Sequence, residues 1–578
     1  MPETTTVRLP RGYWGPEQAR PILDKVLVTR FDADLGGLGE GERAAIGELV
    51  AAAREIQDLA ELTEHHQALA ARHRLRTLHE SLGRPSETAD LLELYEVFQG
   101  PIATTLDNQL QPFLPVDPWV PGRNVYPWGV QAGELRAFLE RRPDRRPEIL
   151  GLHTLVRRTT PQALRRDLAR LRRHRALDTL HPGLRDRLEV LAAAPEREPF
   201  YAVPYSVAWP DRLLSISSHL WRAAEAVAPE DDDLAAYLRQ RSRDLLTDDN
   251  EAGDAAWVRG TFKRLDVVAG AYDVYDDDLF GAKAFFGLTI FRREEAGSAE
   301  LHERMGHLQA IEDALPIDRH RVVTPDIRVG SYDVVAAVAQ GRGTLAEILP
   351  DDADLIRKYG RKIFLRHNYA VDPGLFERVR TRWRAAMAPV HHPELTPLGS
   401  FRETTWHEVG HYLGPDTDRS GRPFEVAIGE DASLFEELKS ELLSVFASLW
   451  LERAGSFSRD EARAVVASSV MTGLRPVRPR RSEPYPMLAL MELNYFLEAG
   501  LLRIEADGLH IDYDRAPEVN ESMLRAVLAI MDHGSRAESN AFIKRYSTWD
   551  ERHERIAARL VAVERYRTLH AHYAALGQ

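Results

Sequence analysis

The residues most able to do chemistry in this sequence are His407 and His411, which stand four positions apart, with Glu408 directly after the first. In a helix of 3.6 residues per turn, a four-residue step places both imidazoles on one face, where they can bind one metal ion. A glutamate beside such a pair can take a proton from a metal-bound water. The pattern therefore predicts the metal centre of a zinc hydrolase with one Zn²⁺ per chain.

A catalytic zinc site usually has three protein ligands and keeps its fourth position for water, so a third ligand must come from elsewhere. Residues 434–443 have the apolar spacing of a helix with one buried side, which leaves Glu437 and Glu441 on another face. We expect Glu437 to be the third ligand. Glu436 and Glu441 are then expected to accept hydrogen bonds from the second ring nitrogens of the histidines. The alternative is that this acidic run is simply a solvated helix face.

Length and composition restrict the class of protein. A chain of 578 residues is too long for one hydrophobic core, so two or more lobes are expected. The hydrophobic content of 44% and charged content of 28% are those of an ordinary globular protein. A net charge of −14 argues against a general nucleic-acid surface. We expect a peptide or small-molecule substrate, no nucleic-acid partner, and a monomer or homodimer.

The absence of cysteine means that a zinc ion must be held by histidine and carboxylate ligands. Residues 1–20 lack the basic segment and apolar run of a signal peptide, and no window approaches the length of a membrane span. We therefore expect a cytoplasmic protein with no membrane partner.

The periodicity along the chain is mainly helical, with a small β portion. Short β-branched runs predict strands at residues 25–31, 321–323 and 362–365. Apolar spacing of three and four from residue 41 to residue 82 predicts paired amphipathic helices. Four histidines in this region form no i, i+4 pair, so a solvated face is favoured there over a second metal site; they are His65, His66, His73 and His79.

A basic loop, residues 475–481, follows the predicted metal helices closely and begins with Arg475. It is a candidate to hold an anionic group of a substrate near the zinc. The alternative is an exposed loop whose prolines restrict its motion.

Several motifs, taken together, resemble the dipeptidyl peptidase III family of zinc metallopeptidases, especially its bacterial branch. They occur in the family's order over about residues 121–500, roughly two-thirds of the chain. The motifs are Asn124–Pro127, Asp248–Trp257, Tyr275–Lys283, His407–Pro415, Glu436–Glu441 and Asn494–Gly500.

The resemblance implies a two-lobed, mainly helical fold with a wide inter-lobe cleft. We expect residues 1–290 to form the N-terminal part of a mixed lobe, residues 291–385 an inter-lobe segment with short strands, and residues 386–578 the helical zinc-binding lobe. By position, His407, His411 and Glu437 match the family's zinc ligands.

The resemblance also implies roles around the metal. Glu408 matches the general base, and Tyr275 matches a tyrosine that stabilises the tetrahedral intermediate. Asp273 stands where the family has a glutamate that helps to hold the free amine of the substrate. Members often carry one extra residue between the histidines, whereas this chain has the shorter spacing.

Three departures from the family pattern, at four positions, concern the substrate site. Where the family's substrate-amine loop has two asparagines around a proline, this chain has Ile348 and Asp351. Tyr485 stands in place of a cleft histidine, and Ala489 replaces an arginine found in some members. A site that loses polar contacts to its substrate discriminates differently.

Three hypotheses follow. The first is a zinc-dependent peptidase that releases dipeptides from peptide N-termini. The second keeps the zinc but acts on a small non-peptide or modified amino-acid compound, as a specialised biosynthetic enzyme. The third is a non-catalytic scaffold, against which the retention of Glu408 beside a full ligand set argues.

Overall fold

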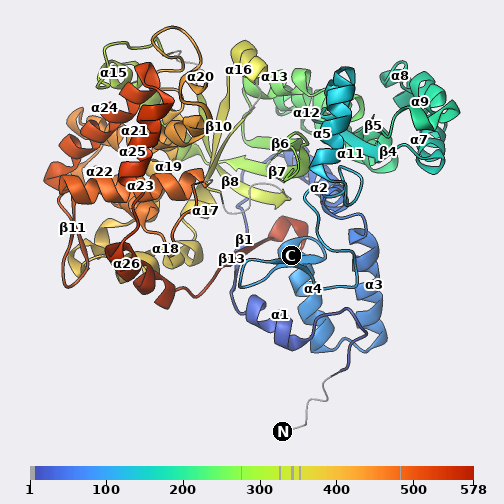
Figure 1. The fold of residues 1–578 in the computed structure, drawn as a ribbon, viewed down its shortest axis with the longest axis horizontal. Helices are drawn as coiled ribbons and strands as arrows, with labels where there is room; N and C mark the ends of the chain where they lie inside the picture. Colours follow the sequence, from blue (N-terminus) through green and yellow to red (C-terminus); the bar gives the residue numbers. More distant parts are fainter. Residues whose placement is uncertain (1–6, 275, 324–326, 340–343, 350–352, 482) are drawn as a thin grey trace. The chain divides into compact units, whose positions relative to one another are not determined.

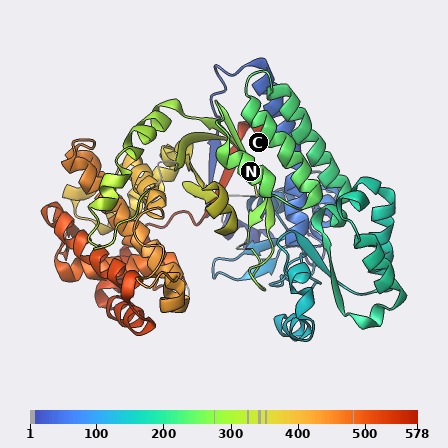
Figure 2. The ribbon, with the colours of Figure 1, turned by 90° about the horizontal axis from the view of Figure 1, so that it is seen from above.

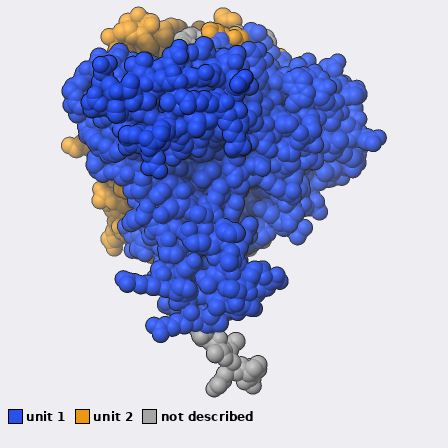
Figure 3. Space-filling view, turned by 90° about the vertical axis from the view of Figure 1, so that its right-hand side faces the viewer, with its two compact units in different colours: residues 1–292, 334–342, 568–578 blue, residues 293–333, 343–567 orange. Residues whose placement is uncertain are grey.

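In the computed structural model, residues 7–578 are described except 275, 324–326, 340–343, 350–352 and 482 (Figure 1). Helices hold 58% of the chain and strands 13%, so the predicted mainly helical, two-lobed class is confirmed. The chain divides into two compact units (Figure 3). Unit 1 comprises residues 1–292, 334–342 and 568–578, and unit 2 comprises residues 293–333 and 343–567.

Unit 1 is built around two long amphipathic helices, α2 and α11, which pack against each other, with α12 beside α11. The buried face of α2 is its alanine, leucine and isoleucine stripe, as the spacing of three and four predicts. The helices of this unit are α1 (Pro16–Leu23), α2 (Glu40–Glu64), α3 (Ala68–Ser81), α4 (Ser86–Phe98), α5 (Ala132–Arg141), α6 (Arg146–Ile149), α7 (Pro161–Arg173), α8 (Arg175–Leu180), α9 (Leu184–Ala193), α10 (Tyr205–Ala208), α11 (Pro210–Val227), α12 (Asp232–Thr247) and α13 (Glu251–Arg259).

Most strands of unit 1 form two-stranded sheets, whereas β6 and β7 are neighbours in a larger sheet. The predicted strand at residues 25–31 is confirmed as β1 (Val26–Phe31), which pairs in parallel with β13 (Thr568–Tyr573) from the far end of the chain. Figure 2 shows this red C-terminal strand beside blue N-terminal chain. The antiparallel pairs are β2 (Ile102–Thr104) with β3 (Leu110–Pro112), β4 (Thr154–Arg158) with β5 (Phe200–Pro204), and β6 (Leu265–Asp273) with β7 (Phe285–Arg293).

Unit 2 is a helical assembly around α21 (Ala432–Arg453), which is buried on nearly all sides. This helix packs against α19, α22, α23 and α24 (Figure 1). The helices of this unit are α14 (Glu295–Met305), α15 (Leu308–Asp313), α16 (Ala353–Tyr359), α17 (His367–Ala370), α18 (Pro373–Ala386), α19 (Pro397–Gly410), α20 (Phe424–Ile428), α21, α22 (Arg459–Gly473), α23 (Pro484–Ala499), α24 (Ala516–His533), α25 (Arg536–Tyr546) and α26 (Glu551–Ala562).

The strands of unit 2 are few. The predicted strand at residues 362–365 is confirmed as β10 (Lys362–Arg366), which pairs antiparallel with β9 (Ala346–Leu349). It also pairs in parallel with the first residues of β8 (Arg328–Val338), a strand whose residues 334–338 fall in unit 1. The prediction of a strand at residues 321–323 is wrong, because this segment is irregular and Val322 is 89% exposed. A short hairpin of β11 (Leu502–Ile504) and β12 (Leu509–Ile511) completes the unit. Within the described residues, no helix combines the length and the apolar character needed to cross a membrane.

Candidate metal centre

Helix α19 carries both histidines of the predicted pair. It begins at Pro397 after Thr396, whose side chain accepts a hydrogen bond from the Gly399 amide at 3.0 Å and caps the helix. The regular helix ends at Gly410, but His411 keeps helical backbone angles, with φ −62° and ψ −20°. The four-residue step therefore places the two rings together, with their centroids 5.2 Å apart.

Glycine at position 410 lets α19 approach α21 closely. A Cβ atom on Gly410 would lie 3.0 Å from the Ser440 Cα, 3.1 Å from the Ser440 carbonyl oxygen and 3.2 Å from the Leu443 Cβ. These distances are shorter than ordinary van der Waals contacts, so a larger residue would push the helices apart. The glycine just before the second histidine thus sets the distance to the helix that carries the predicted third ligand.

The structure brings His407, His411 and Glu437 together. The Glu437 Oε2 atom lies 3.2 Å from His407 Nε2 and 3.8 Å from His411 Nε2. Two donor atoms on a tetrahedral ion with bonds of about 2.1 Å are about 3.4 Å apart, so these separations suit one ion at their centre. These side chains come from two different helices, as the spacing argument expected.

One buried atom shows that the residues fit a metal ion. Among the described residues, Glu437 Oε2 has no hydrogen-bond partner, although it is buried and faces both imidazoles. Buried polar atoms are almost always partnered, and an uncompensated carboxylate oxygen is costly. Two imidazole nitrogens and a carboxylate are a donor set that zinc uses in catalytic sites.

Glu441 and Glu436 face the other ring nitrogens. The Nδ1 of His407 lies 3.1 Å from Glu441 Oε2, and the Nδ1 of His411 lies 3.1 Å from Glu436 Oε1. When each Nδ1–H donates to its carboxylate, the lone pair of each Nε2 points toward Glu437. Lys439, which is buried, donates to Glu436 Oε1 at 2.8 Å and holds that carboxylate in place.

The pKa values of the site show that it favours a positive charge at its centre. Burial lowers the pKa of His407, but Glu437 and Glu441 raise it by more, so it is well above its usual range. Burial raises the pKa of Glu436, but Lys439 and His411 outweigh this effect and bring it down to about 2. Glu436 therefore stays ionised and stabilises either a protonated imidazole or a metal cation.

Two buried glutamates that the sequence reasoning missed lie behind His407. Burial and the charge of Glu441 raise the pKa values of both Glu403 and Glu492 well above the usual range. A protonated Glu403 donates to Glu441 and so supports its contact with His407. Glu403 could have been found from the sequence, because it stands one turn before His407 on the same helix. Glu492 lies on a different helix, α23, and no sequence spacing relates it to the histidines.

The other predicted site residues of unit 2 occupy different environments. Glu408 is half-buried on α19 beside His407. Tyr485, 53% exposed at the start of α23, hydrogen-bonds Glu437 and helps to lower the pKa of that carboxylate against the effect of burial. Arg475 is half-buried, and its charge acts on Glu441 and Glu492. The basic loop thus places the positive charge of Arg475 close to the two glutamates Glu441 and Glu492.

The predicted substrate-binding residues are placed only in part. Ile348 lies in β9, opposite Ile363 of β10, and packs half-buried against the core of unit 2. Asp273 ends β6 of unit 1, with its backbone paired to Phe285. Tyr275 and Asp351 lie outside the described residues.

Comparison with solved structures identifies the class of fold. The structure of DPP III from Caldithrix abyssi superposes with a TM-score of 0.80 at 21% identity, covering 96% of this chain and 98% of that one. The structure of dipeptidyl-peptidase III from Corallococcus sp. strain EGB gives a TM-score of 0.75 at 20% identity, covering 99% and 98%. The chain therefore has the dipeptidyl peptidase III fold, as the motifs predicted.

Comparisons by sequence give fewer and more partial matches than comparisons by structure. No protein-family profile matches the chain. Nudix hydrolase 3 from Arabidopsis thaliana is 24% identical over 359 residues, which cover 60% of this chain. The chain matches 46% of the length of that curated relative.

Proposed function

We propose that the chain is a zinc-dependent hydrolase of peptide amides, with release of dipeptides from peptide N-termini as its default reaction. The observation that carries the proposal is the convergence of His407 Nε2, His411 Nε2 and the unpartnered Glu437 Oε2 in unit 2. The likeness of the fold to two dipeptidyl peptidase III structures supports it. A zinc ion held there would polarise the scissile carbonyl and lower the pKa of its water to about 7.

The chain's own residues supply the remaining steps. Glu441 and Glu436 hold the histidine rings in the tautomer whose Nε2 atoms face Glu437. In the proposal, Glu408 takes a proton from the attacking water and returns it to the leaving amine. Tyr275 donates to the developing oxyanion, a contact typically worth a few kcal/mol. Asp273 holds the free amine of the substrate.

The test compares two carboxylate variants. Purified protein is analysed for zinc by atomic emission and assayed on dipeptidyl arylamides. We expect Glu408→Gln to keep stoichiometric zinc and to lose about 10²–10⁴-fold in turnover, the usual contribution of a general base. Glu518→Gln, an exposed carboxylate in the first turn of α24, is the matched control and should cleave at the original rate. Absence of bound zinc, or equal activity in Glu408→Gln, would refute the proposal.

A second candidate keeps the metal chemistry and changes the substrate to a small non-peptide amide or modified amino acid. It is favoured by the apolar Ile348, which packs against the core, and by Tyr485, whose hydroxyl is engaged with Glu437. Zinc-replete protein that cleaves no arylamide or peptide, but turns over small amides in a manner that depends on Glu408, would decide for this candidate.

A further inference from the structure

The topology of unit 1 brings together residues that lie far apart in the sequence. Strand β13 pairs in parallel with β1, in a register that sets His570 opposite Val28 and His572 opposite Arg30. Because alternate residues of a strand share a face, the two histidines project on the same side of β13. Their ring centroids lie 4.4 Å apart with the planes at 88°.

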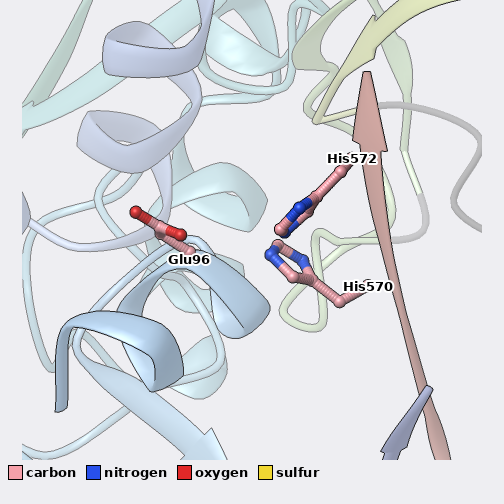
Figure 4. Close-up of side chains that lie close together, drawn as sticks. All are labelled: Glu96, His570 and His572. Atoms are coloured by element: carbon pink, nitrogen blue, oxygen red, sulfur yellow. The ribbon is translucent and has the colours of Figure 1, made fainter. Parts of the chain in front are cut away.

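Helix α4 adds a carboxylate to this histidine pair. Both imidazoles point from β13 toward the helix that carries Glu96 (Figure 4). One potential ligand atom from each of Glu96, His570 and His572 lies within 4.8 Å of the other two. His570 is buried, at 8% exposure, whereas Glu96 is exposed. The cluster therefore has an ordered inner side and a side open to solvent.

We propose that Glu96, His570 and His572 form a second metal site, which binds a divalent transition-metal ion of the Zn²⁺ type. Two imidazoles and one carboxylate suit zinc, nickel or copper, whereas calcium and magnesium prefer sites made of oxygen atoms. Donor atoms on a tetrahedral ion are about 3.4 Å apart, so separations of up to 4.8 Å leave only a small movement for the ligands to close on an ion. The exposed side chain of Glu96 is free to make this movement by a change of rotamer.

The surrounding charges also favour a cation. Glu93 stands one turn before Glu96 on the same exposed side of α4 and interacts with both Glu96 and His572. The positive charge that acts on Glu93 from an arginine is that of Arg20, which forms an ion pair with Asp90 at 2.5 Å. The carboxylate of Glu93 thus adds negative charge near the histidine pair.

The metal would hold the end of the chain in place. A two-stranded sheet is only marginally stable by itself, and β1 and β13 form such a sheet. A ligand that binds only the folded form stabilises it by an amount that grows with the logarithm of the free ligand concentration above its Kd. An ion between α4 and β13 would therefore link these two elements within unit 1.

The experiment measures metal stoichiometry in the full-length, untagged protein after removal of metal by a chelator. Titration with Zn²⁺ should give two ions for the unaltered chain, and one each for Glu96→Gln, for His572→Gln and for His411→Gln of unit 2. His73→Gln, at an exposed histidine of α3, is the matched control and should bind two ions. His411→Gln that binds no ion, or Glu96→Gln and His572→Gln that bind as much as the control, would overturn the proposal.

This design separates the two sites. If the unaltered chain binds one ion and His572→Gln binds none, the site of unit 1 stands while the zinc centre of unit 2 fails.

A second readout does not depend on stoichiometry. Cu²⁺ bound to His411→Gln should show electron paramagnetic resonance coupling to two imidazole nitrogens, and a further His572→Gln change should remove one of them. Hydrogen exchange of residues 568–573 should slow at least tenfold on addition of Zn²⁺ to His411→Gln. Unaltered exchange together with the absence of nitrogen coupling would contradict the site even if all variants fold.

Discussion

Gly410→Ala is the perturbation that most directly tests how helix packing builds the metal centre. The added Cβ atom would lie 3.0 Å from the Ser440 Cα, whereas ordinary contacts begin near 3.4 Å. Helix α19 must therefore move from α21 by about half an ångström. Metal–ligand distances tolerate only about 0.2 Å, so the three donor atoms should no longer fit one ion well. We expect zinc affinity to fall about 10–100-fold, or about 1.4–2.7 kcal/mol.

The stability of the metal-free protein should change less than its zinc affinity. Overpacking costs about 1–3 kcal/mol, but replacing glycine by alanine in a helix recovers about 1 kcal/mol. Competition with a chromophoric chelator measures zinc affinity, and urea unfolding of the metal-free protein measures stability. Gly473→Ala is the matched control, because a Cβ atom there meets nothing closer than 3.5 Å. If Gly410→Ala binds zinc as tightly as Gly473→Ala, the close approach at Gly410 does not set the site.

Three further predictions concern the groups around the histidines and one buried carboxyl. Glu441→Gln should weaken zinc binding about 10–100-fold, because His407 loses its charged acceptor; unchanged affinity in the chelator assay would contradict this role. Lys439→Met should lower the free energy of unfolding by about 3 kcal/mol, since it leaves Glu436 without its cation, and adding Glu436→Gln should restore most of the loss in urea titrations. Burial raises the pKa of Asp248 to about 7, so the folded chain holds a proton between about pH 4 and 7 that the unfolded chain releases. Stability from this group therefore falls as pH rises through that window, and Asp248→Asn should flatten the profile; an unchanged slope would refute the assignment.

The candidate metal centre could be predicted from sequence because its parts follow local rules. Helical spacing places His407 and His411 on one face, and a second helical pattern offers Glu437. The structure brings these groups together with Glu436 and Glu441 at the outer nitrogens. Neither helical pattern predicts that α19 packs against α21, because this contact depends on the close approach at Gly410.

Other features depend on contacts between distant segments and so escaped sequence reasoning. The histidines of β13 face Glu96 only because the end of the chain pairs with β1. Glu492 stands directly between Met491 and Leu493 in a largely apolar helix, so nothing local marks it. The β-branched run around Val322 has strand propensity but forms no strand, because propensity is outweighed by tertiary context.

The parallel pairing of β1 with β13 has a consequence for biosynthesis. More than 500 residues separate the two strands, and ribosomes add about 5–20 residues per second. The N-terminal strand must therefore wait on the order of half a minute to two minutes with its hydrogen-bonding edge uncovered. During that interval an unpaired edge can recruit other chains, so nascent molecules of this protein should depend on chaperones until the last strand emerges.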